Sequence, residues 1–238
     1  MRVSARVRAI PPSPTLAIDT RAKEMLSRGI DVISFGTGEP DFPTPEPVCE
    51  AAIRAMRNGQ TKYTAVGGTV ELKRAIAGFY EARLGVAFAD AEIVASCGGK
   101  HALYNLFMAL LDPGDEVLLP SPYWVSYPVQ IEMAGGVTVP IPGDPANEFA
   151  PTAEQLEAAV TPRTRAIVIN NPCNPTGAYW DSARLAPIAA WLERHPDIVV
   201  ISDAIYESLV YDGASYTELL SLAPGPVSYT HLRAHETR

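Results

Sequence analysis

This chain of 238 residues has few cysteines and few lysines, and its formal net charge is negative, at -8. Its three cysteines, Cys49, Cys97 and Cys173, are odd in number and widely spaced, which argues against a disulfide framework or a zinc site. Only 19 basic residues stand against 27 acidic ones, and this balance argues against a nucleic-acid-binding protein. No apolar run approaches the roughly 20 residues of a membrane-spanning helix. We therefore expect a soluble cytoplasmic protein without a metal ion.

The residues that are present predict a folded domain with alternating helices and strands. Hydrophobic residues make up 47% of the chain and charged residues 19%, and the 22 prolines punctuate the periodic elements. Apolar periodicity predicts helices and short strands in turn. The helices are expected over residues 15–28, 45–58, 69–84, 100–111, 124–134, 152–160 and 182–194, and the strands over residues 31–35, 93–95, 117–119, 137–141, 166–169 and 198–202.

Two of the predicted strands contain wholly apolar runs, at residues 166–169 and 198–201, as expected for strands buried on both faces. Strands of this kind, separated by helices, predict an α/β fold in which a mostly parallel sheet has helices on both faces. Ligands of such a sheet bind beyond the carboxyl ends of its strands. Polar clusters follow four predicted strands directly, at residues 96–100, 121–124, 170–177 and 202–206.

Each cluster is ambiguous by itself. The glycine pair at 98–99 opens a helix and could turn N–H groups toward an anion, although a plain tight turn is the commoner case. Trp124 could stack on a planar ring, but a single tryptophan is more often part of a core. Asn174 offers amide donors to a ligand oxygen. Asp203 is a poor structural choice at a strand end unless it meets a cation, and Tyr206 could lie on the same side of a helical turn.

Together, the clusters and the segments around them resemble the fold-type-I pyridoxal-phosphate aminotransferases, in particular the bacterial aspartate aminotransferase branch. The shared segments are GEPDFPTP (38–45), TKY (61–63), GGKHAL (98–103), DPGDEV (112–117), SPYWVSYP (121–128), NPTG (174–177) and SDAIYE (202–207). The resemblance implies a pyridoxal-phosphate-dependent transferase large domain, truncated before its C-terminal domain. Residues 1–45 would form an N-terminal arm and part of the small domain, and residues 46–227 part of the large domain.

The resemblance implies pyridoxal 5'-phosphate as the cofactor and a role for individual residues around it. Asp203 would face the pyridine nitrogen and keep it protonated, so that the ring can accept electrons from the substrate. Tyr206 and Asn174 would donate hydrogen bonds to the ring hydroxyl. Trp124 would lie against the ring face.

The same resemblance implies contacts to the phosphate and the substrate. Gly99 and Lys100 would offer main-chain N–H groups to the phosphate, and Tyr63 would reach the phosphate of the neighbouring subunit, which implies a homodimer. Lys100 would also meet the distal carboxylate of an acidic substrate, helped by polar groups at Ser13 and Thr15. The implied substrate-binding residues are Gly38, Trp124, Asn174 and Lys100.

The activity implied is transfer of an amino group between an amino acid, aspartate in this branch, and a 2-oxo acid. Related aminotransferases for aromatic amino acids, alanine or prephenate share most of these segments. A carbon–sulfur lyase that uses the same cofactor is a further alternative. From another class, the alternative is a non-catalytic module that binds pyridoxal phosphate. Four retained residues argue against it: Asp203, Tyr206, Asn174 and Trp124.

The chain also departs from the family's pattern. Ala204 stands where the family usually has glutamate. The lysine that forms a Schiff base with the cofactor is absent, as are the arginine after it and the C-terminal domain, so we assign no catalytic residue and expect an inactive fragment. Residues 228–238 resemble a translated sequencing adapter and are expected to be a non-native tail, with no metal site at His231 and His235. The four lysines of the chain are Lys23, Lys62, Lys73 and Lys100.

Overall fold

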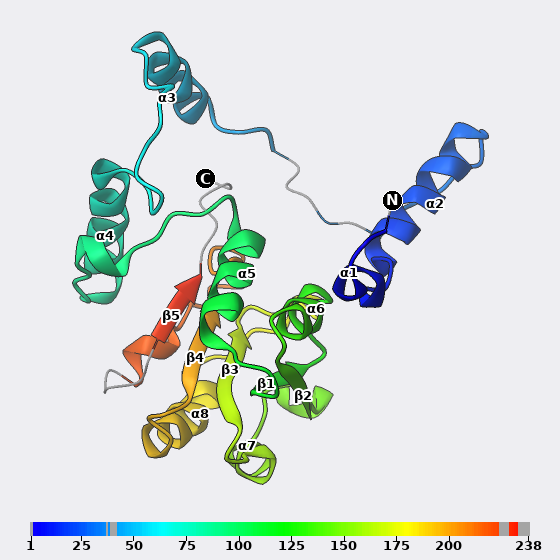
Figure 1. Ribbon diagram of the computed structural model, residues 1–238, viewed down its shortest axis with the longest axis vertical. Helices are drawn as coiled ribbons and strands as arrows, with labels where there is room; N and C mark the ends of the chain where they lie inside the picture. Colours follow the sequence, from blue (N-terminus) through cyan, green and yellow to red (C-terminus); the bar gives the residue numbers. More distant parts are fainter. Residues whose placement is uncertain (1, 37, 39–41, 224–228, 233–238) are drawn as a thin grey trace. The chain divides into compact units, whose positions relative to one another are not determined.

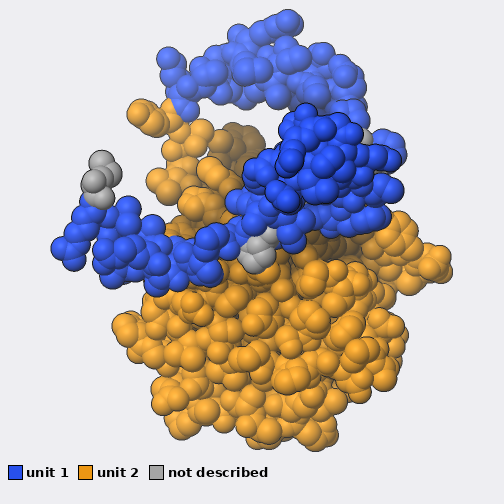
Figure 2. All heavy atoms as spheres, turned by 90° about the vertical axis from the view of Figure 1, so that its right-hand side faces the viewer, with its two compact units in different colours: residues 1–62, 235–238 blue, residues 63–234 orange. Residues whose placement is uncertain are grey.

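The computed structural model describes residues 2–36, 38, 42–223 and 229–232, which fall into two compact units. The first unit contains the described residues up to Lys62, and the second contains those from Tyr63 onward (Figure 2). Residues 39–41 of the GEPDFPTP segment, and residues 228 and 233–238 of the expected tail, lie outside the described residues. Within the described residues, no helix has both the length and the apolar character needed to span a bilayer. The same residues contain no cluster of three or more His, Cys, Asp or Glu side chains suited to a metal ion.

The first unit consists of helices joined by irregular segments. They are α1 (Ala5–Ala9), α2 (Pro14–Ser27) and α3 (Glu46–Arg57). Ser13 caps α2, and its Oγ accepts a hydrogen bond from the main-chain nitrogen of Leu16 at 3.4 Å. A serine directly before a proline at the first helical position is a strong helix start, and it fixes where α2 begins. Helix α1 is not predicted by the sequence pattern.

The strand predicted over residues 31–35 is wrong, because these residues have no regular secondary structure. Two of the apolar side chains that suggested it, Ile33 and Phe35, are 81% and 96% exposed. A strand needs a neighbouring strand to pair its main-chain N–H and C=O groups. The described part of the first unit contains no strand, so apolar content alone did not specify one here.

The second unit is a five-stranded sheet with helices on both faces, as predicted (Figure 1). The strands are β1 (Glu116–Ser121), β2 (Val137–Pro142), β3 (Thr164–Asn170), β4 (Val199–Asp203) and β5 (Tyr229–Leu232). Their order is β2-β1-β3-β4-β5, and every neighbouring pair is parallel. The longer helices are α4 (Val70–Leu84), α5 (Gly99–Leu110), α6 (Ser126–Met133), α7 (Ala153–Ala159) and α8 (Ser182–Arg194).

Alternate residues of the central strands face two separate hydrophobic cores. In β3, Ala166 and Val168 pack with the core beneath α5 and α6, which includes Phe107. Ile167 and Ile169 face the opposite side and pack with the core beneath α7 and α8. Because side chains alternate along a strand, a run of consecutive apolar residues can supply both cores at once. The helices therefore hold the sheet from both sides and fix the positions of its strand ends.

The strand predicted over residues 93–95 is also wrong. The short 3-10 helix η1 (Asp90–Glu92) precedes an irregular segment, in which Ala95 N donates to Gly67 O at 3.0 Å. That single main-chain hydrogen bond to a loop does not extend into a ladder. The other short 3-10 helices are η2 (Pro145–Asn147) and η3 (Leu219–Ser221).

Strand β5 lies inside the segment expected to be a non-native tail. It pairs in parallel with β4, with Tyr229 opposite Val200 and Leu232 opposite Asp203. Main-chain pairing of this kind uses N–H and C=O groups, which almost every residue carries whatever its side chain. The pairing is therefore compatible with a native or a foreign sequence at these positions, and the origin of the tail stays a prediction.

The core beneath α5 and α6 gives the first testable prediction. Phe107 on α5 is fully buried, whereas its neighbour Met108 is 45% exposed. We expect Phe107→Ala to lower the free energy of unfolding by about 3–5 kcal/mol, because the cavity it leaves cannot be filled by the surrounding helices and sheet. Met108→Ala should change it by no more than about 0.5 kcal/mol. Urea unfolding followed by circular dichroism measures both, and equal losses would contradict this assignment of the core.

Candidate functional site

Three strands of the second unit end in polar residues at the same edge of the sheet. Ser121 ends β1, Asn170 ends β3 and Asp203 ends β4. The parallel register places Asn170 directly opposite Asp203. The segments after these strands carry the predicted site residues Trp124, Asn174 and Tyr206. The structure thus brings residues that are up to 82 positions apart, from Trp124 to Tyr206, to one edge of the sheet.

The carboxylate of Asp203 is buried, with 7% of the residue exposed. Its Oδ2 accepts a hydrogen bond from the hydroxyl of Tyr127 at 2.7 Å, and its Oδ1 accepts one from Ile205 N at 3.2 Å. Burial raises the pKa of Tyr127 well above its usual value, and the negative charge of Asp203 raises it further. Tyr127 therefore keeps its proton at neutral pH and remains a donor to Asp203.

Asn174 and Tyr206 contact one another through their side chains. The amide Nδ2 of Asn174 donates to the hydroxyl oxygen of Tyr206 at 3.4 Å. Tyr206 is half-buried, and this burial raises its pKa, the hydrogen bond from Asn174 lowers it, and the charge of Asp203 raises it again. The net effect is a pKa above the usual value, so the hydroxyl of Tyr206 is protonated at neutral pH and is available as a donor.

Trp124 connects Lys100 to the buried tyrosine. Its ring meets that of Tyr127 edge to face, with the centroids 5.4 Å apart and the planes at 85°. The Nζ atom of Lys100 lies 4.8 Å from the centroid of the Trp124 ring, within the range of a cation–π contact. Side-chain contacts therefore run without a break from Lys100 through Trp124 and Tyr127 to Asp203.

The amino end of α5 presents main-chain N–H groups near this cluster. Gly98 occupies the N-cap position with φ 82°, so no side chain caps the helix. A Cβ atom placed on Gly99 would meet no other atom within 4 Å, so there is open space beside the first turn. The helix dipole and the uncapped N–H groups of this turn favour an anion. Gln130 holds the turn from α6, because its Nε2 donates to the main-chain oxygen of Lys100 at 2.9 Å.

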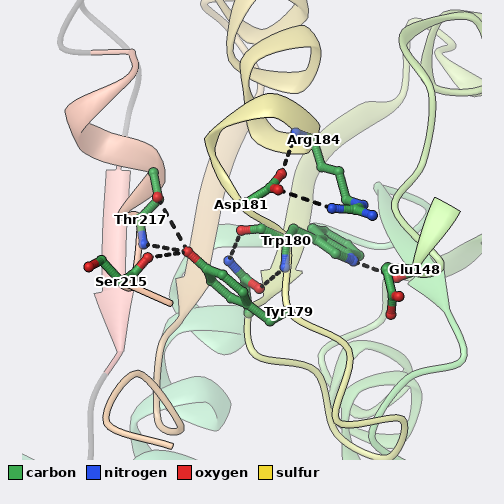
Figure 3. Close-up of polar contacts among 8 residues, drawn as sticks. Glu148, Tyr179, Trp180, Asp181, Arg184, Ser215 and Thr217 are labelled. Atoms are coloured by element: carbon green, nitrogen blue, oxygen red, sulfur yellow. Dashed lines mark hydrogen bonds and ion pairs between the residues drawn. The ribbon is translucent and has the colours of Figure 1, made fainter. Parts of the chain in front are cut away.

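The loop that carries Asn174 is closed by a framework of hydrogen bonds. The side chain of Asn171 accepts from Trp180 N at 2.8 Å and donates to Trp180 O at 3.0 Å. Trp180 Nε1 donates to the main-chain oxygen of Glu148 at 2.7 Å (Figure 3). The hydroxyl of Tyr179 bonds to Ser215 O and accepts from Thr217 N at 3.1 Å (Figure 3). The bonds between Asn171 and Trp180 therefore close the base of the loop, and Trp180 and Tyr179 tie its far end to neighbouring segments.

Two predicted site residues are not part of this cluster. Gly38 belongs to the first unit, where it is exposed and a Cβ atom on it would meet nothing within 4 Å. Tyr63 begins the second unit and its side chain is fully exposed. Ser13, expected near the substrate, caps α2 in the first unit.

The sequence analysis missed the roles of Tyr127, Gln130 and Asn170. Trp124, Tyr127 and Gln130 are spaced three residues apart in and just before α6, and this spacing places them on one side of the helix. That periodicity, inside the SPYWVSYP segment and just after it, was the signal that could have identified them. The partner of Tyr127 is 76 positions away, however, and no pattern in the sequence identifies it.

The donor set of this edge fits the cofactor predicted from the sequence. A buried carboxylate suits a protonated ring nitrogen, and the amide of Asn174 with the hydroxyl of Tyr206 suits a ring oxygen. An indole ring suits a flat aromatic face, and the uncapped amino end of α5 suits a phosphate. Asp203, Asn174, Tyr206, Trp124 and the first turn of α5 could therefore hold pyridoxal phosphate.

Comparison with known proteins gives one family match that covers most of the chain. The family described as aminotransferase class I and II matches residues 30–232. Aspartate aminotransferase from Geobacillus stearothermophilus is 46% identical over 224 residues, which cover 94% of this chain and 57% of that protein. Aspartate/prephenate aminotransferase from Cereibacter sphaeroides is 46% identical over 216 residues, covering 91% of this chain and 54% of that protein.

Solved structures of aspartate aminotransferases also align with most of this chain. Aspartate aminotransferase from Thermus thermophilus with maleate aligns with a TM-score of 0.91 at 42% identity, over 99% of this chain and 61% of that one. The aspartate aminotransferase from Rhizobium meliloti aligns with a TM-score of 0.90 at 44% identity, over 94% of this chain and 56% of that one. This chain therefore spans about 57% of the length of the first relative and about 61% of the first structure.

The hydrogen bond from Tyr127 to Asp203 gives the second prediction. Tyr127→Phe removes the hydroxyl and leaves a buried carboxylate oxygen without that donor, so we expect the free energy of unfolding to fall by about 1–3 kcal/mol. Tyr123→Phe is the matched control, because Tyr123 is half-buried next to Trp124 and its hydroxyl makes no hydrogen bond within the described part of the chain. Urea unfolding at pH 7 measures both variants. The same loss in both variants would show that the Tyr127 hydroxyl does not support Asp203.

Proposed function

The chain belongs to the class I and II aminotransferase family, and on this premise we propose that the whole protein is a pyridoxal-phosphate-dependent aminotransferase. It transfers an amino group between an amino acid, with aspartate as the preferred donor, and a 2-oxo acid. The observation that carries the proposal is the buried Asp203 at the end of β4, bonded to Tyr127 at 2.7 Å and joined by contacts to Trp124 and Lys100. A buried carboxylate is costly unless a cationic partner or strong donors compensate it.

The residues of this chain would bind and orient the cofactor. When bound, pyridoxal phosphate supplies a ring that accepts the electron pair released at the α-carbon of the amino acid. Asp203, held by Tyr127, would keep a proton on the ring nitrogen. The amide of Asn174 and the protonated hydroxyl of Tyr206 would donate to the ring oxygen. Trp124 would cover the ring face and exclude water from it.

The phosphate would be bound at the amino end of α5, through the main-chain N–H groups of Gly99 and Lys100. The helix dipole stabilises an anion there, and no side chain competes for the N–H groups. Gln130 supports this role, because its hydrogen bond to Lys100 O holds the first turn in place.

An acidic substrate is supported by Lys100 and by the relatives. The ammonium group of Lys100 contacts the face of Trp124 and could meet a distal carboxylate, while Gly38, Trp124 and Asn174 would bind the remainder of the substrate. One similar structure was solved with maleate, which is a dicarboxylate. Another relative is an aspartate/prephenate aminotransferase, so prephenate, also a dicarboxylate, is a candidate amino acceptor.

We further propose that the whole protein is a cytoplasmic homodimer. The fully exposed side chain of Tyr63 is consistent with a residue that reaches the cofactor phosphate of a neighbouring subunit. Residues 46–227 would then form part of the large, cofactor-binding domain, and residues 1–45 the arm and part of the small domain. Residues 228–238 would be a tail foreign to that protein.

The 238-residue chain by itself is proposed to be inactive, because the family's Schiff-base lysine should come after the SDAIYE segment (202–207) and none of the chain's four lysines lies beyond residue 100. We expect it to bind pyridoxal phosphate without a covalent bond. Asp203→Ala should weaken binding about 10- to 100-fold, the loss expected for a charge-assisted hydrogen bond. Asp144→Ala, at an exposed cap of η2, should leave binding unchanged.

Equilibrium dialysis measures binding, and mass spectrometry after borohydride reduction detects covalent attachment. A stoichiometric adduct at one lysine, or equal binding by all variants, would refute the proposal.

The substrate preference is tested on the whole protein. We expect its kcat/KM for aspartate to exceed the values for alanine and phenylalanine, and Lys100→Ala to reduce the value for aspartate much more than the value for alanine. The reason is that alanine has no distal carboxylate for Lys100 to meet. Coupled assays of 2-oxo acid formation measure these values. A negligible rate with aspartate, or an equal loss for both substrates, would contradict the role of Lys100.

A further inference from the structure

The side chain of Asn170 joins two of the residues proposed to contact the cofactor. Asn170 ends β3 and is 8% exposed. Its Nδ2 donates to the main-chain oxygen of Asp203 at 3.0 Å, and its Oδ1 accepts from the main-chain nitrogen of Asn174 at 2.8 Å. The first bond crosses from β3 to β4, and the second crosses to the loop that follows β3. One buried amide therefore ties both residues to the end of the same strand.

We propose that Asn170 is a positioning residue that sets the location of Asn174 relative to Asp203, and through it the contact between Asn174 and Tyr206. This inference rests on the proposed function for its link to pyridoxal phosphate. It goes beyond that function, because Asn170 makes no contact with the cofactor in the proposed site and acts only through its neighbours.

The chemistry of asparagine suits this position better than that of its nearest substitutes. The two bonds require a donor and an acceptor on one short, flat group. Aspartate has two acceptors and no donor when ionised, and its charge would lie next to that of Asp203. Leucine has neither, and glutamine is longer by one methylene group. In a buried site, a polar group that loses its only partner is left unsatisfied, at a cost in stability.

Removal of the Asn170 side chain would mainly affect the position of Asn174. The main-chain oxygen of Asp203 also accepts a hydrogen bond from Asn171 N at 3.2 Å, so it keeps a partner without Asn170. The main-chain nitrogen of Asn174 would lose its 2.8 Å bond to Oδ1. The base of the loop would stay closed by the two bonds between Asn171 and Trp180. Asn174 would therefore move within an otherwise intact loop.

Tyr206 reports such a movement directly. The bond from Asn174 Nδ2 to the Tyr206 hydroxyl is 3.4 Å long, close to the limit for a hydrogen bond, so a small shift of Asn174 breaks it. This bond lowers the pKa of Tyr206, while burial and the charge of Asp203 raise it. Loss of the bond should therefore raise the pKa of Tyr206.

The experiment is a double-mutant cycle in the 238-residue chain with Asn170→Ala, Asn174→Ala and the double variant. The first readout, taken without cofactor, is the pKa of Tyr206 from ultraviolet titration, with Tyr206→Phe subtracted to remove the other nine of the ten tyrosines. The second is the Kd for pyridoxal phosphate from equilibrium dialysis. Asn147→Ala is the matched control, because it removes a side-chain bond of 3.0 Å to Ala150 O in a different loop.

If Asn170 acts through Asn174, the two changes are not additive. Each single variant should raise the pKa of Tyr206 and weaken cofactor binding about 5- to 10-fold, and the double variant should match the single variants within about twofold. Asn147→Ala should change neither readout. An unchanged pKa of Tyr206 in Asn170→Ala, or losses in Kd that multiply in the double variant, would overturn the proposal.

Two measurements keep the test decisive. Circular dichroism checks that Asn170→Ala is folded, and Asn170→Ser replaces it in the cycle if it is not. If the unaltered chain fails to bind pyridoxal phosphate, the proposal that this chain binds the cofactor by itself falls. The titration of Tyr206 without cofactor then still decides whether Asn170 positions Asn174.

Discussion

The parallel pairing of β3 with β4 determines where the polar groups of the site lie. It sets Asn170 opposite Asp203, and every further contact of the cluster extends from these two strand ends. A shift of the register by one residue would turn Asp203 from one face of the sheet to the other, because successive side chains alternate. Two hydrophobic cores prevent this shift, since each apolar residue of β3 is already committed to one of them.

Helix α6 connects the carboxyl end of the sheet to the amino end of α5. Tyr127 bonds to Asp203, Gln130 bonds to the main chain of Lys100, and Trp124 lies just before the helix against Tyr127. Because the three residues are spaced as neighbours on one side of a helix, a movement of α6 would disturb all three contacts together. The proposed anion site and the buried carboxylate are therefore mechanically linked through one short helix, packed beneath the sheet by Tyr127 and Ile131.

The sequence predicted most of the second unit and less of the first. The central strands of the second unit contain wholly apolar runs at residues 166–169 and 198–201, and helices separate these strands along the chain, so the pattern is specific. The predicted strands at residues 31–35 and 93–95 were wrong, because a short apolar run becomes a strand only where a neighbour pairs with its main chain. Tyr127 and Asn170 were missed as partners of Asp203, because each contact spans more than 30 positions of the chain.

The sequence by itself determined the types of group that stand at the strand ends: a carboxylate at Asp203, an amide at Asn174, a hydroxyl at Tyr206 and an indole at Trp124. Local patterns fix such groups to the end of a strand or the start of a helix, because propensity and capping act over a few residues. Only the tertiary structure decided which groups meet, that Asp203 is buried against Tyr127, and that Asn170 joins Asp203 to Asn174. Those contacts depend on the order and register of the strands, which result from packing of the whole sheet between its two layers of helices.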